Sequence, residues 1–312
     1  MSELVLHHYP NSPFSEKVRL VLGLKGVAWR SVHVPRVMPK PDVVALTGGY
    51  RRTPFMQIGA DVYCDSALMC RVVDRLWPEP PLYPTASAGL AEIVAQWADA
   101  ALFWSAVPFT MQPAGAAHVF AGLPAEAVAA FGADRAAMSP GVRRAPTADA
   151  GAALAAYLGR LEAMLADDRP FLLGAEPCIA DVSVTQSIWF MRLAPPIAAR
   201  LAGYPKLVRW HERVAAFGHG RATPMKSGEA IEIAANATAF AATAVAADQP
   251  FALGAAVRVA AADYAHDEIL GNVVGLDDDE VVVERHDARA GTLHVHFPRI
   301  GFHIKPQHKD PA

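Results

Sequence analysis

The sequence predicts an α/β domain, followed by an all-α domain and a small C-terminal β module. Strand and helix patterns alternate over the first 80 residues, as in α/β folds. Residues 85–225 are rich in alanine and repeat apolar side chains at helical spacing. After residue 249, short runs of alternating apolar and polar residues follow one another, separated by turn signals.

Turn and cap residues divide the first predicted domain, residues 1–80, into elements. An apolar run ends at Tyr9-Pro10, and Gly26 ends the helix pattern that follows it. Gly59-Ala60 joins two later strands as a hairpin. The expected order is strand 4–8, a helix to 26, strand 27–34, a short helix 42–46, strands 55–58 and 62–64, and helix 66–77.

Longer helices and then short strands are expected in the rest of the chain. In the all-α domain, residues 85–225, the helical stretches are 90–104, 125–131, 148–165, 179–193 and 205–217. A connecting helix is expected in residues 226–248, from Glu229 to Ala247. Residues 249–306 predict a small β-barrel-like module with strands 257–261, 269–276, 280–285, 293–297 and 302–304.

Composition excludes several classes of protein. The 312 residues are 53% hydrophobic and 19% charged, which excludes disorder for most of the chain. A net charge of −3 leaves no basic surplus for binding nucleic acid. The most apolar long stretch, 233–247, is shorter than the ~18 residues that suggest a membrane span. The 3 cysteines are an odd, sparse set that suits a reducing compartment, so we expect a soluble cytoplasmic protein.

Ser12 is the candidate catalytic residue. It precedes Pro13, and the pair is typical of the cap and first residue of a helix. In structural terms this is an ordinary helix start. The same hydroxyl and free N–H groups stabilise an anion, and a thiol at such a helix end ionises more easily.

Two further motifs predict a binding site for a peptide-like ligand. Thr53-Pro54, at the start of a strand, is a candidate cis peptide whose backbone faces a groove, and Arg52 adds positive charge beside it. Asp65-Ser66 opens a helix, where the N-terminus binds a carboxylate and Asp65 pairs with an ammonium group. A ligand with an amino-acid end, a peptide middle and a thiol fits all three motifs.

With these motifs the sequence resembles the glutathione S-transferase family over residues 1–225. The motifs are Ser-Pro-Phe-Ser-Glu-Lys-Val-Arg from Ser12, the Thr53-Pro54 step and Asp65-Ser66. The resemblance implies a thioredoxin-like N-terminal domain and a helical C-terminal domain. It also implies that Ser12 supports the glutathione thiolate, with Ser15 a weaker candidate, and that Thr53 bonds the cysteinyl backbone.

The resemblance assigns the remaining contacts of glutathione as well. Asp65 and Ser66 would hold the γ-glutamyl end, while Lys40 or Arg52 would lie near the glycine carboxylate. Family members usually have an aliphatic residue where this chain has Thr53, and Glu or Gln where it has Asp65. They also have Ser or Thr where this chain has Cys178, three residues before the structural acid Asp181.

We therefore expect a glutathione transferase that attacks a small apolar electrophile, in a homodimer with a role in detoxification. Tyr9 is an alternative thiol partner, and Trp104 is expected in the apolar pocket. The absence of a cysteine at the helix start argues against a disulfide reductase. The second hypothesis is a non-catalytic scaffold protein whose C-terminal module binds a partner. No metal is expected, because His294 and His296 lack a convincing third ligand.

Overall fold

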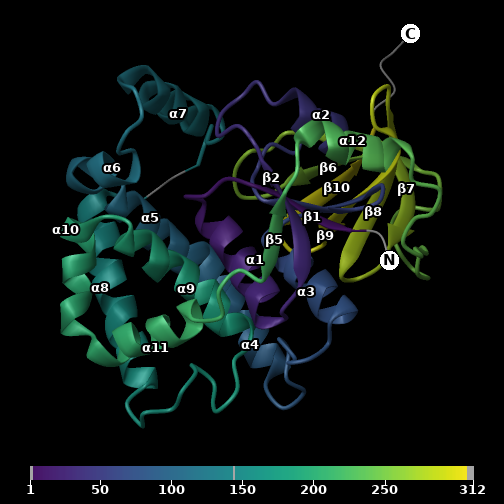
Figure 1. Ribbon diagram of the computed structural model, residues 1–312. Coiled ribbons are helices and arrows are strands. Elements are labelled where there is room, and N and C mark those ends of the chain that lie inside the picture. Colours follow the sequence, from purple (N-terminus) through teal and green to yellow (C-terminus); the bar gives the residue numbers. More distant parts are fainter. Residues whose placement is uncertain (1–2, 143–144, 308–312) are drawn as a thin grey trace.

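The computed structural model describes residues 3–142 and 145–307 as two halves, one helical and one built on a sheet (Figure 1). The N-terminal unit has the thioredoxin-like order β1 (Leu4–His8), α1 (Pro13–Leu24), β2 (Ala28–His33), α2 (Pro41–Thr47), β3 (Phe55–Ile58), β4 (Asp61–Cys64) and α3 (Ser66–Leu76). Strand β1 pairs in parallel with β2 and antiparallel with β3, which confirms the predicted α/β domain.

The helical domain starts with three consecutive helices and is centred on α9. Its elements are α4 (Ala88–Trp97), the π-helix η1 (Ala98–Leu102), α5 (Phe103–Thr110), α6 (Pro113–Val119), α7 (Ala125–Ala137), α8 (Thr147–Met164), α9 (Ile179–Arg192), α10 (Pro195–Ala198), the 3₁₀ helix η2 (Ala199–Gly203) and α11 (Pro205–Ala215). The predicted all-α domain is thus confirmed. None of the helices in the described part of the chain combines the length and the apolar character that a membrane span requires.

The chain then returns to the sheet and extends it at both edges. Its last elements are β5 (Arg221–Pro224), α12 (Ser227–Ala235), β6 (Ala256–Ala261), β7 (Ile269–Leu276), β8 (Glu280–Asp287), β9 (Gly291–Pro298) and β10 (Phe302–Pro306). Strand β5, which the sequence did not predict, pairs in parallel with β2. Strands β6–β10, with the loops between them, are called the extension below.

The extension is confirmed, but it is joined to the first domain rather than closed on itself as a barrel-like module. Over the described residues, the strand order of the sheet is β10-β6-β7-β8-β9-β4-β3-β1-β2-β5. The join is a parallel pair in which Asp61 of β4 lies opposite His294 of β9. The extension therefore covers the edge that β4 would otherwise leave open.

The predicted connecting helix over 226–248 is wrong in its extent, because α12 ends at Ala235. The alanine-rich segment after it has helical propensity, but its backbone groups bond to other parts of the chain. The amide of Ala241 donates to Asp61 Oδ2 at 2.8 Å, and that of Ala246 donates to the Leu276 carbonyl at 2.8 Å. These long-range bonds outweigh local propensity.

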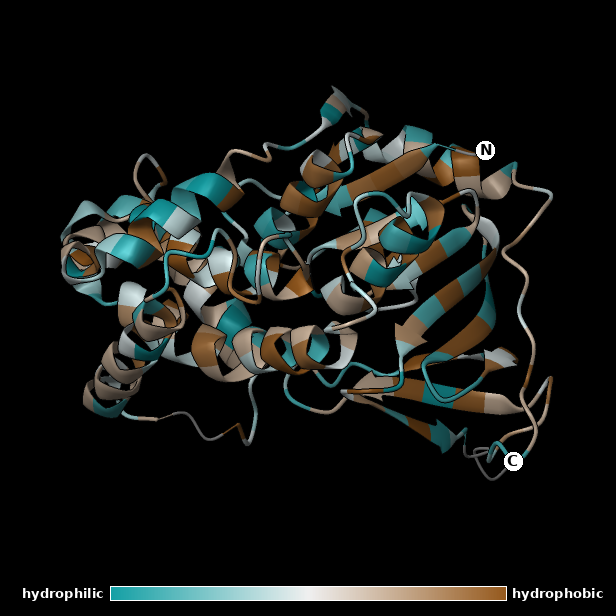
Figure 2. Cartoon of the chain, turned by 90° about the horizontal axis from the view of Figure 1, so that it is seen from below, coloured by the Kyte–Doolittle hydropathy of each residue, from teal (hydrophilic) through white to brown (hydrophobic). Residues whose placement is uncertain are grey.

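Two apolar clusters of buried residues lie on opposite faces of the sheet. Leu4 and Leu6 of β1 face one cluster, with α1, α3 and the helical domain, while Val5 faces the other, with α2 and α12. Much of the extension's buried apolar surface belongs to the second cluster. Hydrophobic and hydrophilic residues alternate along the strands at this end of the molecule, as expected for a sheet with one covered face (Figure 2).

Asp181 holds the start of α9. Its carboxylate is fully buried and accepts from the amides of Leu172 at 2.8 Å and Cys178 at 2.9 Å, and from Trp210 Nε1 at 2.8 Å. The expected structural role is confirmed, with Cys178 at the cap position.

Replacing Asp181 by alanine should destabilise the fold while leaving any ligand site in folded molecules intact. Three buried N–H groups would lose their acceptor, which we expect to cost about 3–5 kcal/mol. Urea unfolding measures the loss, and Asp167→Ala, at an exposed carboxylate, is the control. Equal stability of the two variants would contradict this role.

His296 links the extension to the first domain. Its Nε2 lies 2.9 Å from Asp61 Oδ1, and its Nδ1 lies 2.5 Å from Glu280 Oε1. Burial favours the neutral ring, but hydrogen bonds and charges of Asp61 and Glu280 outweigh it, so the pKa of His296 is raised. Protonated His296 donates to both carboxylates, while His294 lies beside it and stacks on Phe240.

We predict that His296→Gln destabilises the protein most at the acid side of neutrality. Because the folded pKa lies above the unfolded value of about 6.5, the stabilisation is fully present below that pH and is lost as the pH rises through the folded pKa. Urea unfolding at about pH 6 and about pH 9 compares the variant with wild type, and the exposed His303→Gln is the control. A stability gap that widens with pH would sink the prediction.

Candidate functional site

Ser12 caps α1 and touches the neighbouring loop. Its backbone is extended, with φ −88° and ψ 122°, and its Oγ accepts from the amide of Ser15 at 3.3 Å. The hydroxyl also donates to the Thr53 carbonyl at 3.5 Å, a long and therefore weak hydrogen bond. Ser12 is 2% exposed, so its hydroxyl is almost fully enclosed by the protein.

Thr53 and Pro54 are joined by a cis peptide bond, as the sequence suggested. Both residues line a cavity of about 880 Å³ between the sheet, the helical domain and the extension. Asp65 and Ser66 line the same cavity. The structure thus brings two of the three motifs into one cavity wall. Ser12 does not line the cavity and is connected to it only through its bond to the Thr53 carbonyl.

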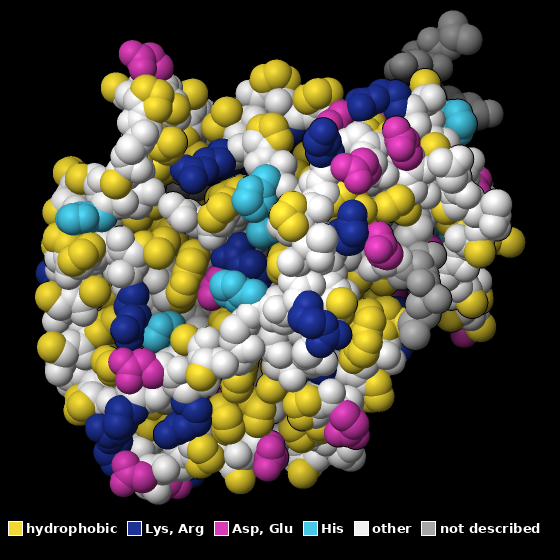
Figure 3. All heavy atoms as spheres, viewed as in Figure 1, with side chains coloured by type: hydrophobic (Ala, Val, Ile, Leu, Met, Phe, Trp, Pro, Cys, Tyr) yellow, Lys and Arg dark blue, Asp and Glu magenta, His cyan; other side chains and the backbone are white. Residues whose placement is uncertain are grey.

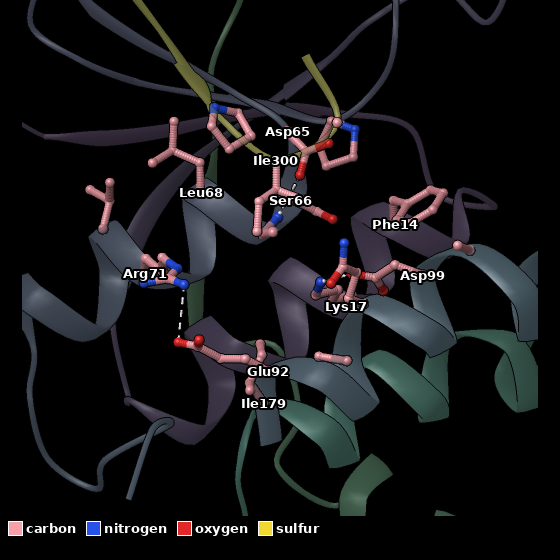
Figure 4. A pocket seen from close by; sticks show the side chains of 18 of the residues that line it. Phe14, Lys17, Asp65, Ser66, Leu68, Arg71, Glu92, Asp99, Ile179 and Ile300 are labelled. Carbon is pink, nitrogen blue, oxygen red and sulfur yellow. Dashed lines mark hydrogen bonds and ion pairs between the residues drawn. The ribbon is translucent and has the colours of Figure 1, made fainter. Parts of the chain in front are cut away.

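Asp65 and Ser66 form the start of α3. Asp65 has a positive φ of 78°, a conformation that costs a non-glycine residue roughly 1–3 kcal/mol. Its carboxylate accepts from the amide of Ala67 at 2.8 Å, which holds this backbone in place. Figure 4 shows Ser66 beside Asp65, on the side of the cavity opposite Lys17 and Asp99. A strained cap facing a cavity favours a binding role.

An ion pair that the sequence analysis missed lies across from Ser66. Lys17 of α1 is fully buried, and its Nζ donates to Asp99 Oδ2 of η1 at 2.5 Å (Figure 4). Gln186 of α9 donates to the other carboxylate oxygen at 2.6 Å. Burial acts to lower the pKa of Lys17, but Asp99 outweighs it and the pKa is raised, so Lys17 is charged. The sequence did contain a signal for this pair, because Lys17 is a charged residue on the buried face of an amphipathic helix and therefore needs a partner.

The basic candidates are engaged by the protein itself. Lys40 lies in a smaller pocket of about 370 Å³, and its Nζ donates to the Arg51 carbonyl at 3.1 Å. Burial, reinforced by Arg135 and Arg51, lowers the pKa of Lys40 to about 8. Arg52 lines the main cavity but is paired with Asp263 and the Tyr264 carbonyl of the extension. The structure does not bring Lys40 together with the other site residues.

The extension forms part of the cavity wall, which the sequence did not predict. Its lining residues are Asp263, Tyr264, Asp279, Glu280, Pro298, Ile300 and Gly301. Ile300 reaches toward Ser66 in Figure 4, while Arg71 and Glu92 form an ion pair of 3.0 Å elsewhere in the cavity. Phe14, Phe103 and Trp104 add aromatic surface, with Trp104 in the place expected.

A second group of charged side chains joins the two halves outside the cavity. Arg19 donates to Glu16 at 2.6 Å and contacts His8 at 3.0 Å, while His219 contacts Glu16 at 3.0 Å. In Figure 3, histidine and basic side chains gather where the halves meet. Burial, with Arg19 next in effect, lowers the pKa of His8 to about 3, so His8 is a neutral structural residue.

A thioredoxin-like domain on a helical domain, with a cavity at a cis-proline loop, defines a glutathione-transferase-type fold. The family model for the glutathione S-transferase N-terminal domain matches residues 6–81, and that for the C-terminal domain matches residues 95–213. The chain belongs to the glutathione S-transferase family.

Among the solved structures, at least one is similar to the whole chain and others to only part of it. A GST-like protein from Pseudomonas syringae is 39% identical, with a TM-score of 0.82, over 98% of this chain and 100% of that one. A glutathione S-transferase from Rhodospirillum rubrum is 17% identical over 68% of this chain and 88% of that one, with a TM-score of 0.52, and shows the fold alone. Alignment over 98% of the chain includes the extension.

A curated relative matches only part of the chain. Pyrimidodiazepine synthase from Drosophila melanogaster is 30% identical over 76 residues, which are 23% of this chain and 31% of that protein. The match therefore spans about a third of that relative's length.

Proposed function

We propose that the protein is a glutathione transferase in which Ser12 stabilises the thiolate. The observation that carries the proposal is the cavity shared by Thr53, Pro54, Asp65 and Ser66. Ser12 is not itself a lining residue, but its hydroxyl bonds to the carbonyl of the lining residue Thr53. Its volume of about 880 Å³ lies within the range of roughly 300–1,000 Å³ typical of ligand pockets. The cavity thus offers room for glutathione together with a second substrate.

In this proposal the parts of glutathione follow the polarity of the wall. The γ-glutamyl carboxylate binds Ser66 at the N-terminus of α3, and its ammonium group faces Asp65. The cysteinyl backbone pairs with Thr53, which places the thiol near the hydroxyl of Ser12. Arg52 lies in this wall, but its guanidinium is already paired with Asp263, so it adds little net positive charge for the glycine carboxylate.

The chemical step follows from the position of Ser12. The helix end and the hydroxyl lower the thiol pKa from about 8.5, so the proton leaves to solvent before attack. The sulfur electron pair then forms a C–S bond to an electrophilic carbon while the leaving group departs with its own pair. The weak bond of Ser12 to Thr53 is easily exchanged for a stronger one to the thiolate.

Isothermal titration with reduced glutathione and the variant Ser12→Ala test the proposal together. We expect saturable 1:1 binding by the wild type. We also expect turnover by Ser12→Ala to fall about 10–100-fold, because a hydrogen bond to a charged group contributes ~1.5–3 kcal/mol. Loss of the helix cap should cost only about 0.5–2 kcal/mol of stability.

Ser15→Ala separates the two candidate serines. Ser15 is buried on the same helix and its hydroxyl has no partner among the described residues, so we expect turnover by this variant to stay at the wild-type level. Unchanged turnover in Ser12→Ala would refute the role of Ser12. No binding of glutathione or of a thiol-blocked analogue would refute the transferase proposal and favour the scaffold hypothesis.

We also propose a cytoplasmic homodimer that acts in detoxification. The 3 cysteines, Cys64, Cys70 and Cys178, are free and buried, which suits a reducing compartment. Because β9 occupies the β4 edge, two copies have to meet on another surface. Leu76 of α3 and Leu90 of α4, which are 38% and 54% exposed, offer apolar area for that contact.

Sedimentation velocity tests the assembly. Wild type should sediment as a dimer, and Leu90→Asp should shift it toward the monomer, because a charge is costly in an apolar interface. Leu253→Asp, at a residue 70% exposed just before β6, should leave the dimer unchanged. A monomeric wild type would exclude the homodimer.

A further inference from the structure

A continuous row of aromatic rings runs from α1 to the extension along the cavity. Phe14 and Phe103 have ring centroids 4.6 Å apart, and Phe103 and Trp104 have centroids 5.0 Å apart. Trp104 meets Tyr264 edge-on, with centroids 5.4 Å apart and planes at 89°. All four residues line the cavity, so a ligand there meets one aromatic wall built from three parts of the chain.

Tyr264 is fixed at the end of this row. The guanidinium carbon of Arg52 lies 4.0 Å from the centroid of its ring, within the range of a cation–π contact. Arg52 also donates to the Tyr264 carbonyl and pairs with Asp263. The next residue, Ala265, donates its amide to the Met138 carbonyl at 2.7 Å, which ties the loop to the helical domain. The ring is therefore positioned before any ligand enters.

We propose that the loop between β6 and β7 is part of the second-substrate site and that Tyr264 determines specificity for flat aromatic electrophiles. The aromatic row begins at Phe14, two residues after the proposed thiolate partner Ser12. In this proposal an aryl electrophile packs on the row, at the α1 end of the cavity where the thiol is expected. The inference rests on the proposed transferase function and adds a specificity-determining residue from outside the helical domain.

Aromatic side chains favour this class of substrate for a physical reason. Rings stack offset or edge-to-face on other rings, which gives an interaction beyond the burial of apolar area. An aliphatic electrophile of similar size gains only the burial. The preference of the wild type should therefore depend on the ring of Tyr264 and not on its hydroxyl.

Turnover of glutathione with 1-chloro-2,4-dinitrobenzene and with an unsaturated aliphatic aldehyde, by the full-length protein, tests the proposal. In the aryl reaction the C–S bond forms, the C–Cl bond breaks, chloride leaves, and the thiol proton goes to solvent. Tyr264→Leu keeps apolar bulk but removes the ring, and should lower kcat/KM for the aryl chloride about tenfold. Its kcat/KM for the aldehyde and its affinity for glutathione should stay within about twofold of wild type.

Tyr264→Phe and a remote substitution are the matched controls. Tyr264→Phe keeps the ring and should retain the aryl preference, and Leu270→Ala, on the exposed side of β7, should leave both reactions unchanged. An equal effect of Tyr264→Leu on both electrophiles, or no effect on the aryl chloride, would overturn the role of Tyr264 alone. A wild type that neither binds nor turns over glutathione would overturn the transferase proposal and this inference with it.

Discussion

The burial of α1 between the sheet and the helical domain is the constraint on which the rest of the structure depends. Its charged residues Glu16, Lys17 and Arg19 are at most 5% exposed, so each of them needs a partner in the folded protein. Lys17 finds Asp99 in the helical domain, and Glu16 is contacted by His219, just before β5. The helix that carries Ser12 at its start is thereby fixed to both halves, and the cavity between them has a defined wall.

Local patterns were sufficient to predict most elements, because caps, turns and apolar repeats act within a few residues. Strand β7 has the predicted bounds, Ile269–Leu276, and Gly59 has the positive φ expected of a hairpin turn. Pairing partners were not predictable in the same way. Strand β5 is short and fully exposed, and it is held by pairing with β2, about 190 residues away in the chain. The alanine-rich segment after α12 likewise follows its distant bonding partners and not its propensity.

The residues of the candidate site also fall into those that local sequence predicts and those that depend on tertiary packing. Ser12, Thr53-Pro54 and Asp65-Ser66 were predictable because a cap, a proline step and a helix start are written in adjacent residues. The sequence could not predict whether Lys40 and Arg52 are free to bind a ligand, because tertiary packing determines their partners. Arg52 and Asp263 are separated by 211 positions, and Lys17 and Asp99 by 82. Sequence reasoning identified Thr53, Asp65 and Ser66 in the cavity wall but missed Lys17 and Asp99, and only the fold shows which charges are already paired.

The pairing of the extension with β4 affects both the stability of the sheet and the shape of the cavity. The β4–β9 pair removes an open sheet edge, which would otherwise be a site for unwanted pairing. The same pairing sets Pro298 and Ile300, at and just after the end of β9, at the cavity, while the β6–β7 loop reaches Arg52. A shift of β9 by one residue would turn its side chains to the opposite face and separate His296 from Asp61. The register of one strand pair therefore couples the stability of the extension to the shape of the cavity.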